Sequence, residues 1–388
     1  MTNMKVHHAI ITAAISLIAT IPQSAAAQRH EIFSEDIKSL QVVCGGKWLS
    51  MPVMQLCGSS PDNVMNISFD DLTHTYRRYT YSIEHCEADW TTSDGLFQSN
   101  YIDGFANDNT IEDIEESVNT NVLYTHYSLT IPNPKCRPKI SGNYRLTVRD
   151  DDTGEKVLSA CFMVVEPVVS IGMEATTNTD IDTNNSHQQI GMSVKYNNLR
   201  VTDPQTQIKT TVLQNRRWDN AKTNVKPQYI TTDGLQWTHN RSYIFEAGNE
   251  YHKFESLATS HPTMGIDNIS WDGENYHAWL MKDDPRPNYL YDEDANGAFY
   301  IRNSDNYEND RTSDYLYVHF TLNSPQPAAD DVYINGAWTY DSFAPAYRME
   351  YNNEKKRYEA NILLKQGYYS YQYITLGPDG TTGIRPIM

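Results

Sequence analysis

Apolar and polar residues alternate with a period of two in many short stretches of this chain. In one of the clearest stretches, Tyr79, Tyr81 and Ile83 are separated by polar residues, which predicts a strand with one buried face. The same alternation recurs at residues 65–69, 123–129, 144–148, 190–196, 316–322, 358–364 and 369–373. Many short strands separated by turn residues predict an all-β fold of tandem immunoglobulin-like β-sandwich domains.

Breaks in this alternation divide the chain into three units. A length of 388 residues suits two or three domains. Glu166-Pro167 follows the strands of the first unit, and the polar stretch 305–313 precedes those of the last. We therefore expect an N-terminal β-sandwich at residues 28–165, a second at 166–308 and a C-terminal one at 309–388.

The first 27 residues have the composition of a secretory signal peptide. Lys5 provides a charged start, the apolar run Ala9–Ile21 is too short to span a bilayer, and Ala25-Ala26-Ala27 resembles a cleavage site. The first cysteine is Cys44, so no lipid-attachment cysteine follows that site. We expect residues 1–27 to be removed and the mature protein to be exported, into the periplasm or beyond.

Charge and hydropathy argue against several classes of partner. The formal net charge is -18, whereas nucleic acid and anionic lipid are bound through clustered cations. No segment after the first 27 residues approaches the length of an apolar membrane-spanning helix. We therefore expect neither nucleic-acid binding nor direct membrane insertion, and the sequence indicates no oligomeric state.

All five cysteines lie in the first 165 residues, at Cys44, Cys57, Cys86, Cys136 and Cys161. An odd number leaves at least one thiol free, even in an oxidising compartment. A local Cys44–Cys57 bridge is one pairing that the spacing allows, and the connectivity stays open. No cysteine or histidine spacing matches a zinc site.

No sequence motif for catalysis or cofactor binding is present. The patterns G-x-S-x-G, H-E-x-x-H, G-x-G-x-x-G and the P-loop are all absent. His85, Cys86 and Asp89 form the one cluster that suggests a nucleophile, but neighbours in a strand point to opposite faces and cannot pair. We therefore predict no catalytic residue, no cofactor and a structural corner here, with an enzyme using these three residues as the alternative.

A second candidate site is the segment Asp292-Glu293-Asp294-Ala295-Asn296-Gly297, which resembles the start of a calcium loop. Oxygen ligands from Asp292, Asp294 and Asn296 would suit a hard cation, yet the twelfth position of such a loop holds Asn303 in place of glutamate. Asn-Gly is also a strong turn signal. A plain turn is the favoured interpretation, and calcium binding is the alternative.

Aromatic residues of the last unit offer a third candidate. Trp338, Tyr340 and the tyrosines at 368–373 would suit stacking on sugar rings if they were exposed, as in carbohydrate-binding modules. Packing of the same rings into a sandwich core is the simpler interpretation. A glycan-binding protein that uses exposed Trp338 and Tyr340 therefore stands as the alternative function.

The chain also resembles a known family. Segments such as His85-Cys86-Glu87-Ala88-Asp89-Trp90 and Gln214-Asn215-Arg216-Arg217-Trp218 are similar to the type IX secretion plug protein family of Bacteroidota. The ordered segments are 69–72, 85–90, 101–105, 119–120, 124–127, 131–133, 141–144, 214–218, 247–250 and 284–286. The family-marker residues, for which we expect structural roles, are His85, Cys86, Asp89, Trp90, Tyr101, Asp103, Gly104, Phe105, Asn215 and Trp218.

The resemblance implies a non-enzymatic, all-β periplasmic protein. Members of the family associate with the outer-membrane β-barrel translocon of type IX secretion and are thought to occlude its periplasmic mouth. The last unit additionally resembles an early-set sandwich of the kind that accompanies glycogen-binding modules, a likeness of fold from which function does not follow. The family usually continues beyond the last strand, whereas this chain ends at Met388; we therefore expect an open sheet edge at residues 369–374.

Overall fold

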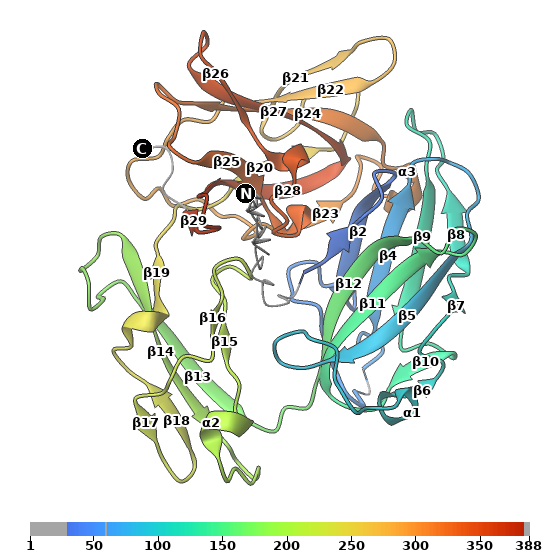
Figure 1. Cartoon of the computed structure of the whole chain (residues 1–388). Coiled ribbons are helices and arrows are strands. Elements are labelled where there is room, and N and C mark those ends of the chain that lie inside the picture. The colour runs from blue at the N-terminus through green and yellow to red at the C-terminus, as the bar shows by residue number, and fades with distance from the viewer. Residues whose placement is uncertain (1–28, 59, 384–388) are drawn as a thin grey trace, which may run out of the picture.

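A computed structural model describes residues 29–58 and 60–383, and it is almost entirely β-structure arranged in three units (Figure 1). The predicted all-β fold of tandem sandwiches is confirmed. The predicted signal peptide at residues 1–27 lies outside the described residues. No helix within the described ranges is long and apolar enough to cross a membrane.

The first unit is a sandwich of two sheets, with strand orders β1-β12-β11-β5-β7 and β2-β4-β9-β8, where β3 also pairs with β12. Its elements are β1 (Glu31–Ile32), β2 (Ile37–Cys44), β3 (Val53–Gln55), β4 (Met65–Asp71), β5 (Tyr79–Cys86), α1 (Gln98–Tyr101), β6 (Ile102–Gly104), β7 (Asn109–Thr110), β8 (Asp113–Glu116), β9 (Thr125–Ile131), β10 (Cys136–Pro138), β11 (Gly142–Asp150) and β12 (Lys156–Val165). Alternate residues of the long strands fill the core, where Phe69, Tyr79 and Tyr127 pack ring against ring. The period of two in the sequence is therefore the period of burial.

The middle unit is smaller and has one main sheet, β13-β14-β18-β17, with β19 also on β14, and a separate β15-β16 pair. Its elements are β13 (Ser170–Thr176), β14 (His187–Lys195), α2 (Pro204–Gln207), β15 (Thr211–Val212), β16 (Lys222–Thr223), β17 (Tyr229–Ile230), β18 (Gly234–Trp237), η1 (Arg241–Tyr243) and β19 (Ile244–Glu246). Trp237 and Tyr243 are buried at the centre of its core.

The third unit is again a two-sheet sandwich, with orders β21-β22-β24-β27-β26 and β20-β28-β23, where β25 and β29 also pair with β28. Its elements are β20 (His252–Ser256), β21 (Ile266–Trp271), β22 (Tyr276–Leu280), β23 (Phe299–Ile301), α3 (Asn309–Thr312), β24 (Tyr315–Asn323), β25 (Asp331–Asn335), η2 (Ala337–Thr339), η3 (Pro345–Tyr347), β26 (Glu350–Asn352), β27 (Arg357–Lys365), β28 (Gly367–Leu376) and β29 (Thr382–Gly383). The open edge expected at residues 369–374 is closed only in part. Residues 367–369 of β28 pair with both β20 and β23, and residues 375–376 pair with both β25 and β29, whereas residues 370–374 have one strand partner each.

The pairing of strands β20 to β23 places them in the third unit and so moves the boundary between the second and third units. These strands fall inside the range 166–308 expected for the second domain, yet they pair with β24 and β28 of the third unit. We therefore propose that the third unit begins between Glu246 and His252, where β19 ends and β20 starts. A sheet partner more than 60 residues downstream leaves no local signal in the sequence.

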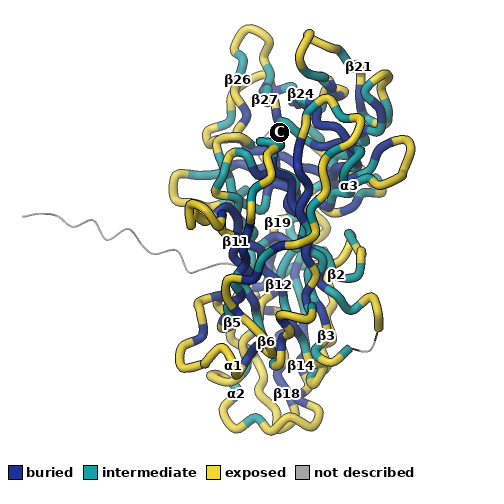
Figure 2. Tube along the Cα trace, turned by 90° about the vertical axis from the view of Figure 1, so that its right-hand side faces the viewer, coloured by how far each residue is buried: buried dark blue, intermediate teal, exposed yellow. Residues whose placement is uncertain are grey.

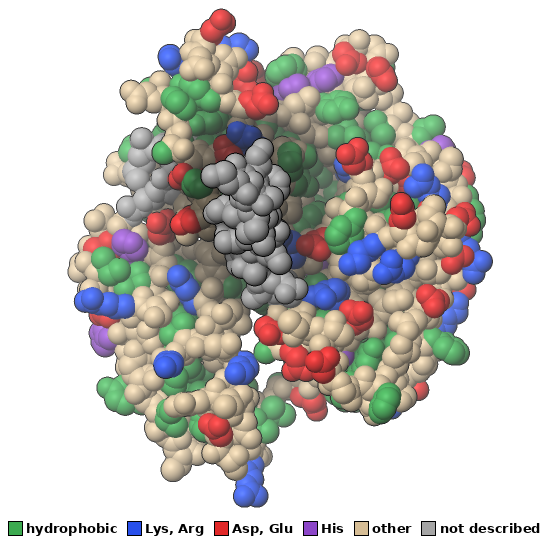
Figure 3. Space-filling view, in the orientation of Figure 1, with side chains coloured by type: hydrophobic (Ala, Val, Ile, Leu, Met, Phe, Trp, Pro, Cys, Tyr) green, Lys and Arg blue, Asp and Glu red, His purple; other side chains and the backbone are tan. Residues whose placement is uncertain are grey.

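The three units pack against one another around the centre of the molecule. The first unit lies beside the third, and the middle unit lies below the third (Figure 1). Buried segments run along the inner strands while the loops at the ends are exposed (Figure 2). On the face drawn in Figure 3, acidic and basic side chains are interspersed, without a broad basic area.

Candidate functional site

Strand β5 and the loop after it place His85, Cys86 and Asp89 in three separate environments. The His85 ring lies within hydrogen-bond distance of the Ser93 hydroxyl (2.8 Å) and the Ser141 carbonyl (3.3 Å). Cys86 lies on the opposite face of the strand, buried with Trp90 and Cys161. Asp89 is exposed and accepts two hydrogen bonds from Thr91. The three side chains make different contacts and do not form a nucleophile–base pair.

We expect iodoacetamide to label Cys57 in the native protein much faster than Cys86, Cys136 or Cys161. Cys57 is exposed, whereas the other three are buried. Burial also raises the pKa of Cys86 to about 11 and that of Cys136 to about 12, which removes the reactive thiolate. Peptide mass spectrometry reads the labelling, and protein unfolded in urea is the control. Fast native labelling of Cys86 would contradict its placement.

All five thiols are free, so the Cys44–Cys57 bridge does not form.

The remaining markers of the first unit surround the turn from β5 to β6. Trp90 is buried and packs edge-on against Trp218 of the middle unit, with ring centroids 5.9 Å apart. Tyr101 is buried and its hydroxyl donates to the Ile83 carbonyl. Asp103 and Gly104 lie in β6, Phe105 comes directly after it, and all three are exposed. This group therefore contributes both to the core and to an exposed surface.

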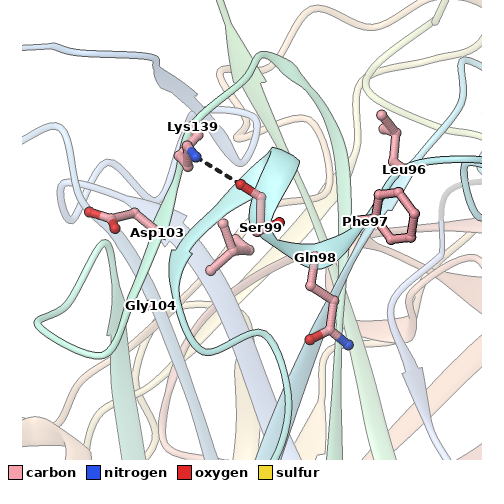
Figure 4. A pocket seen from close by; sticks show the side chains of 8 residues that line it. Leu96, Phe97, Gln98, Ser99, Asp103, Gly104 and Lys139 are labelled. Carbon is pink, nitrogen blue, oxygen red and sulfur yellow. Dashed lines mark hydrogen bonds between the residues drawn. The ribbon is translucent and has the colours of Figure 1, made fainter.

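That surface is the end of the first unit at α1 and β6, where Phe97 is 78% exposed and Phe105 is 69% exposed. Beside Phe97 lies an open depression of about 730 Å³, with Leu96 and Phe97 on one side and Asp103 and Lys139 on the other (Figure 4). Lys139 donates to the Ser99 carbonyl across it, at 2.7 Å. Asp103 and Lys139 are the two ionisable residues of its lining. Exposed apolar side chains that lie together, as Leu96 and Phe97 do here, offer area for a protein contact.

The first and third units are joined by a buried ion pair. Lys365 of β27 lies 2.6 Å from Asp70 of β4, and both side chains are 1% exposed. The Tyr315 hydroxyl donates to the same carboxylate, and His126 lies 2.6 Å from its other oxygen. Burial raises the pKa of Asp70, but Lys365 and His126 outweigh it and hold the pKa below its usual value. Asp70 is therefore an ionised carboxylate, stabilised by the Lys365 charge and by the contacts from Tyr315 and His126.

Further hydrogen bonds support this interface. Asp314, at the start of the third unit's long strand, accepts hydrogen bonds from the backbone N–H groups of Asn121 and Val122. The Tyr124 hydroxyl donates to the carbonyls of Asp310 and Ser313. Buried, satisfied polar contacts of this density hold two domains in one fixed arrangement.

The loop 214–220 of the middle unit contacts both other units. The Trp218 backbone N–H donates to Asp341 of the third unit at 3.1 Å, and Arg216 donates to the Leu49 carbonyl of the first. Arg217 is 4% exposed and pairs with Asp219, which also accepts a hydrogen bond from Thr382. Asn215, the neighbouring marker, lies at the rim of the cleft between the middle and third units. We name this loop, with Trp90 and Asp341, the three-unit junction.

The cleft between the middle and third units, about 740 Å³, holds ionisable groups that sequence reasoning missed. His252 lies 2.7 Å from Asp283, whose other oxygen accepts hydrogen bonds from the Tyr371 and Tyr373 hydroxyls. Arg286 reaches the Glu250 carbonyl. Burial raises the pKa of Asp283, but His252 and the two tyrosine hydroxyls outweigh burial and hold this pKa below its usual value. In the sequence, this cleft was marked only by the family segments 247–250 and 284–286, and neither segment matched a catalytic or ligand-binding motif.

The calcium candidate forms a turn. Asp292 lies 2.7 Å from the Lys253 ammonium group, and Asp294 accepts hydrogen bonds from the backbone N–H groups of Asn296 and Tyr251. Asn296 and Gly297 both have positive φ, at 49° and 83°, as a primed turn requires. In the described part of the chain, no group of three His, Cys, Asp or Glu side chains is placed to hold a metal. The carboxylates are engaged by protein donors.

The glycan candidate Trp338 is buried, as the favoured core-packing interpretation expects, and Tyr340 is half-buried. Trp338 is 4% exposed and its indole N–H donates to the Ser370 carbonyl at 3.1 Å. Tyr340 donates to the Leu40 carbonyl of the first unit at 2.8 Å. One ring therefore fills the sandwich core and the other seals the contact between the first and third units.

Comparisons with known proteins agree with this architecture. A family model described as the type 9 secretion system plug protein 1st domain matches residues 37–166. Among solved structures, a hypothetical protein from Parabacteroides merdae ATCC 43184 is 40% identical in sequence, with a TM-score of 0.88. That match covers 93% of this chain and 91% of the other. No match was found among curated proteins.

The fold and its interfaces define a tandem β-sandwich protein whose three units are fixed together by buried polar contacts. Residues 37–166, which make up most of the first unit, match the first domain of the type 9 secretion system plug proteins.

Proposed function

We propose that this protein occludes the periplasmic mouth of the outer-membrane translocon of type IX secretion when no substrate is passing, without catalysing a reaction. The family match over residues 37–166 is the observation that carries the proposal. We further propose that residues 1–27 direct export to the periplasm and that the protein reaches the outer membrane only through its partner. A pore that passes folded cargo would leak unless a body of matching size covered it.

Two structural features support this role. A cover must resist deformation, and the ion pair Asp70–Lys365 together with the three-unit junction holds three sandwiches as one body. A cover also needs a contact surface, and a specific protein contact buries about 1,600 Å² in total. The exposed side chains of Leu96, Phe97 and Phe105 at the end of the first unit offer apolar area for such a contact.

Affinity capture of the tagged protein from native membranes tests the proposal. We expect recovery of a very large outer-membrane β-barrel, and a deletion strain that becomes permeable to antibiotics too large for porins. The double variant Phe97→Asp and Phe105→Asp should lose most of the barrel, because two charges would be buried in the contact. Tyr76→Asp, at a residue 73% exposed elsewhere on the first unit, is the matched control.

Two outcomes would count against this function. Capture that recovers no barrel from a strain that makes one would remove the proposed partner. An intact permeability barrier in the deletion strain would remove occlusion while leaving a role in secretion. Loss of the barrel in the Tyr76→Asp control as well would move the contact away from residues 96–105.

A further inference from the structure

The outer face of the sheet β21-β22-β24-β27-β26 carries a groove of about 1010 Å³ to which nothing described above assigns a role. Its lining includes residues from all five strands and from the segment 345–348. Strands β22, β24 and β27 are each paired on both sides, so their backbone groups are already used. A ligand that lies over these three central strands is therefore recognised through side chains, since only the edge strands β21 and β26 have an unpaired side.

Four side chains form a row across the groove, because their strands are in register. Asn268 of β21 lies beside Trp279 of β22, which lies beside His319 of β24, which lies beside Asn361 of β27. Trp279 points outward since its neighbours Ala278 and Leu280 face the core. It is 43% exposed, a large value for an indole ring at the middle of a sheet face.

The Trp279 ring is fixed in place on one side and open on the other. The ring stacks on the His319 imidazole with ring centroids 3.7 Å apart and planes 7° from parallel, and Trp279 as a whole remains 43% exposed. Its indole N–H donates to the Ser270 hydroxyl at 3.2 Å. His319 is held in turn by His277, at 2.8 Å, and His277 by Asp272, at 2.9 Å. Burial and His277 lower the pKa of His319 to about 4, so this imidazole is uncharged at neutral pH.

The groove mixes both signs of charge: its lining has the cations Lys282, Arg348, Lys355 and Arg357 and the carboxylates Asp267, Glu350 and Glu359. Arg357 and Lys355 both pair with Glu359, and Arg348 pairs with Asp331. Paired side chains keep hydrogen-bonding capacity but present little net charge to a ligand. The groove therefore offers one flat apolar ring surrounded by amides and compensated ionic groups, which does not suit a polyanion.

We propose that this groove binds a neutral glycan chain, with one sugar ring stacked on the open face of Trp279. A pyranose ring has C–H groups on its faces and hydroxyls around its edge, so a flat indole and peripheral hydrogen-bonding groups complement both. Asn268 and Asn361, at either end of the row, would bind hydroxyls of that ring or of its neighbours. This binding is independent of the plug function and uses a different unit from the Phe97 surface.

The test is a glycan array of neutral α- and β-linked hexose and N-acetylhexosamine chains, followed by calorimetry with the best tetrasaccharide. We expect saturable binding, and Trp279→Ala should weaken it about tenfold or more. Trp271→Ala is the matched control, because Trp271 is 48% exposed on the same hairpin, packs on Tyr276 and does not line the groove. Asn361→Ala, at an exposed residue, should weaken binding by a smaller factor.

Three results would overturn the proposal. The first is no binding of any array member and no calorimetric signal up to ~10 mM tetrasaccharide. The second is equal affinity of the wild type and Trp279→Ala. The third is equal loss in Trp279→Ala and Trp271→Ala with both variants folded by circular dichroism, which would place binding elsewhere on the hairpin.

Discussion

Replacing Lys365 with alanine should lower the free energy of unfolding by about 3–5 kcal/mol, the range for breaking a buried ion pair. The ammonium group lies 2.6 Å from Asp70, and both side chains are 1% exposed. Without it, Asp70 keeps its hydrogen bonds from Tyr315 and His126 but becomes a buried carboxylate without its main counter-charge. Equilibrium urea unfolding, followed by tryptophan fluorescence, measures the loss.

Lys355→Ala is the matched control for this experiment. Lys355 also pairs with an acidic residue, Glu359 at 3.3 Å, but its side chain is 54% exposed. Exposed pairs contribute about 0–1 kcal/mol, so the control should unfold almost as the wild type does. If Lys365→Ala fails to fold, the double variant with Asp70→Asn should restore folding, because it removes the stranded charge. Equal stability of Lys365→Ala and Lys355→Ala would contradict a buried pair at this interface.

The position of Lys365 also shows what the sequence can and cannot predict. The alternation of Tyr358, Ile362 and Leu364 predicted β27 correctly, because a period of two is a local property. The same alternation places Lys365 on the outer face, where a lysine normally meets water. The end of that face at Lys365 is covered by the first unit, and Asp70 lies 295 residues away in the chain. Which faces are covered depends on domain packing, which leaves no periodic signal.

For the candidate sites too, the sequence predicted what depends on local strand geometry and missed what depends on packing between distant segments. The spacing of His85 and Cys86 on one strand was enough to separate their side chains, because direction in a strand is fixed by the backbone. Core packing was the favoured interpretation of Trp338, which is 4% exposed, whereas the 43% exposed ring of Trp279 was not among the candidates. Trp279 could have been chosen from its outward position between Ala278 and Leu280, but its stacking partner His319 comes from a strand 40 residues later.

The three-unit junction was visible in the sequence as a motif without a role. Asn215-Arg216-Arg217-Trp218 was recognised as a family segment, yet its contacts lie at Trp90 in the first unit and Asp341 in the third. A loop that contacts two other domains has no periodicity and no catalytic pattern to mark it. Its importance follows from burial of Arg217, which can be learned only from the fold.

Replacing Arg217 with methionine should destabilise the protein by about 3 kcal/mol at about pH 7.5. Methionine preserves much of the buried volume while removing the charge that neutralises Asp219, whose side chain is 5% exposed. Asp341 lies close enough that Asp219 contributes to its raised pKa, after the larger contribution of burial. Without Arg217, two carboxylates would face each other at the junction without a cation.

The sign of the pH dependence distinguishes this mechanism from a simple packing defect. A carboxyl group whose pKa is raised in the folded state takes up its proton at a pH where the unfolded chain does not, so stability rises as the pH falls. The deficit of Arg217→Met relative to wild type should therefore shrink on going from about pH 7.5 to about pH 5, as Asp341, whose pKa is raised by burial and by the Asp219 charge, gains a proton. Urea unfolding at both pH values measures it.

Arg348→Met provides the control, because Arg348 pairs with Asp331 at 2.8 Å with both side chains about half exposed. Its unfolding should match the wild type at each pH, since a solvated pair contributes little and leaves no buried charge behind. A deficit in Arg217→Met that is unchanged or larger at the lower pH would mean that lost packing, and not uncompensated charge, accounts for the effect. The middle unit would then be joined to the other two mainly through Trp218 and its contact with Trp90.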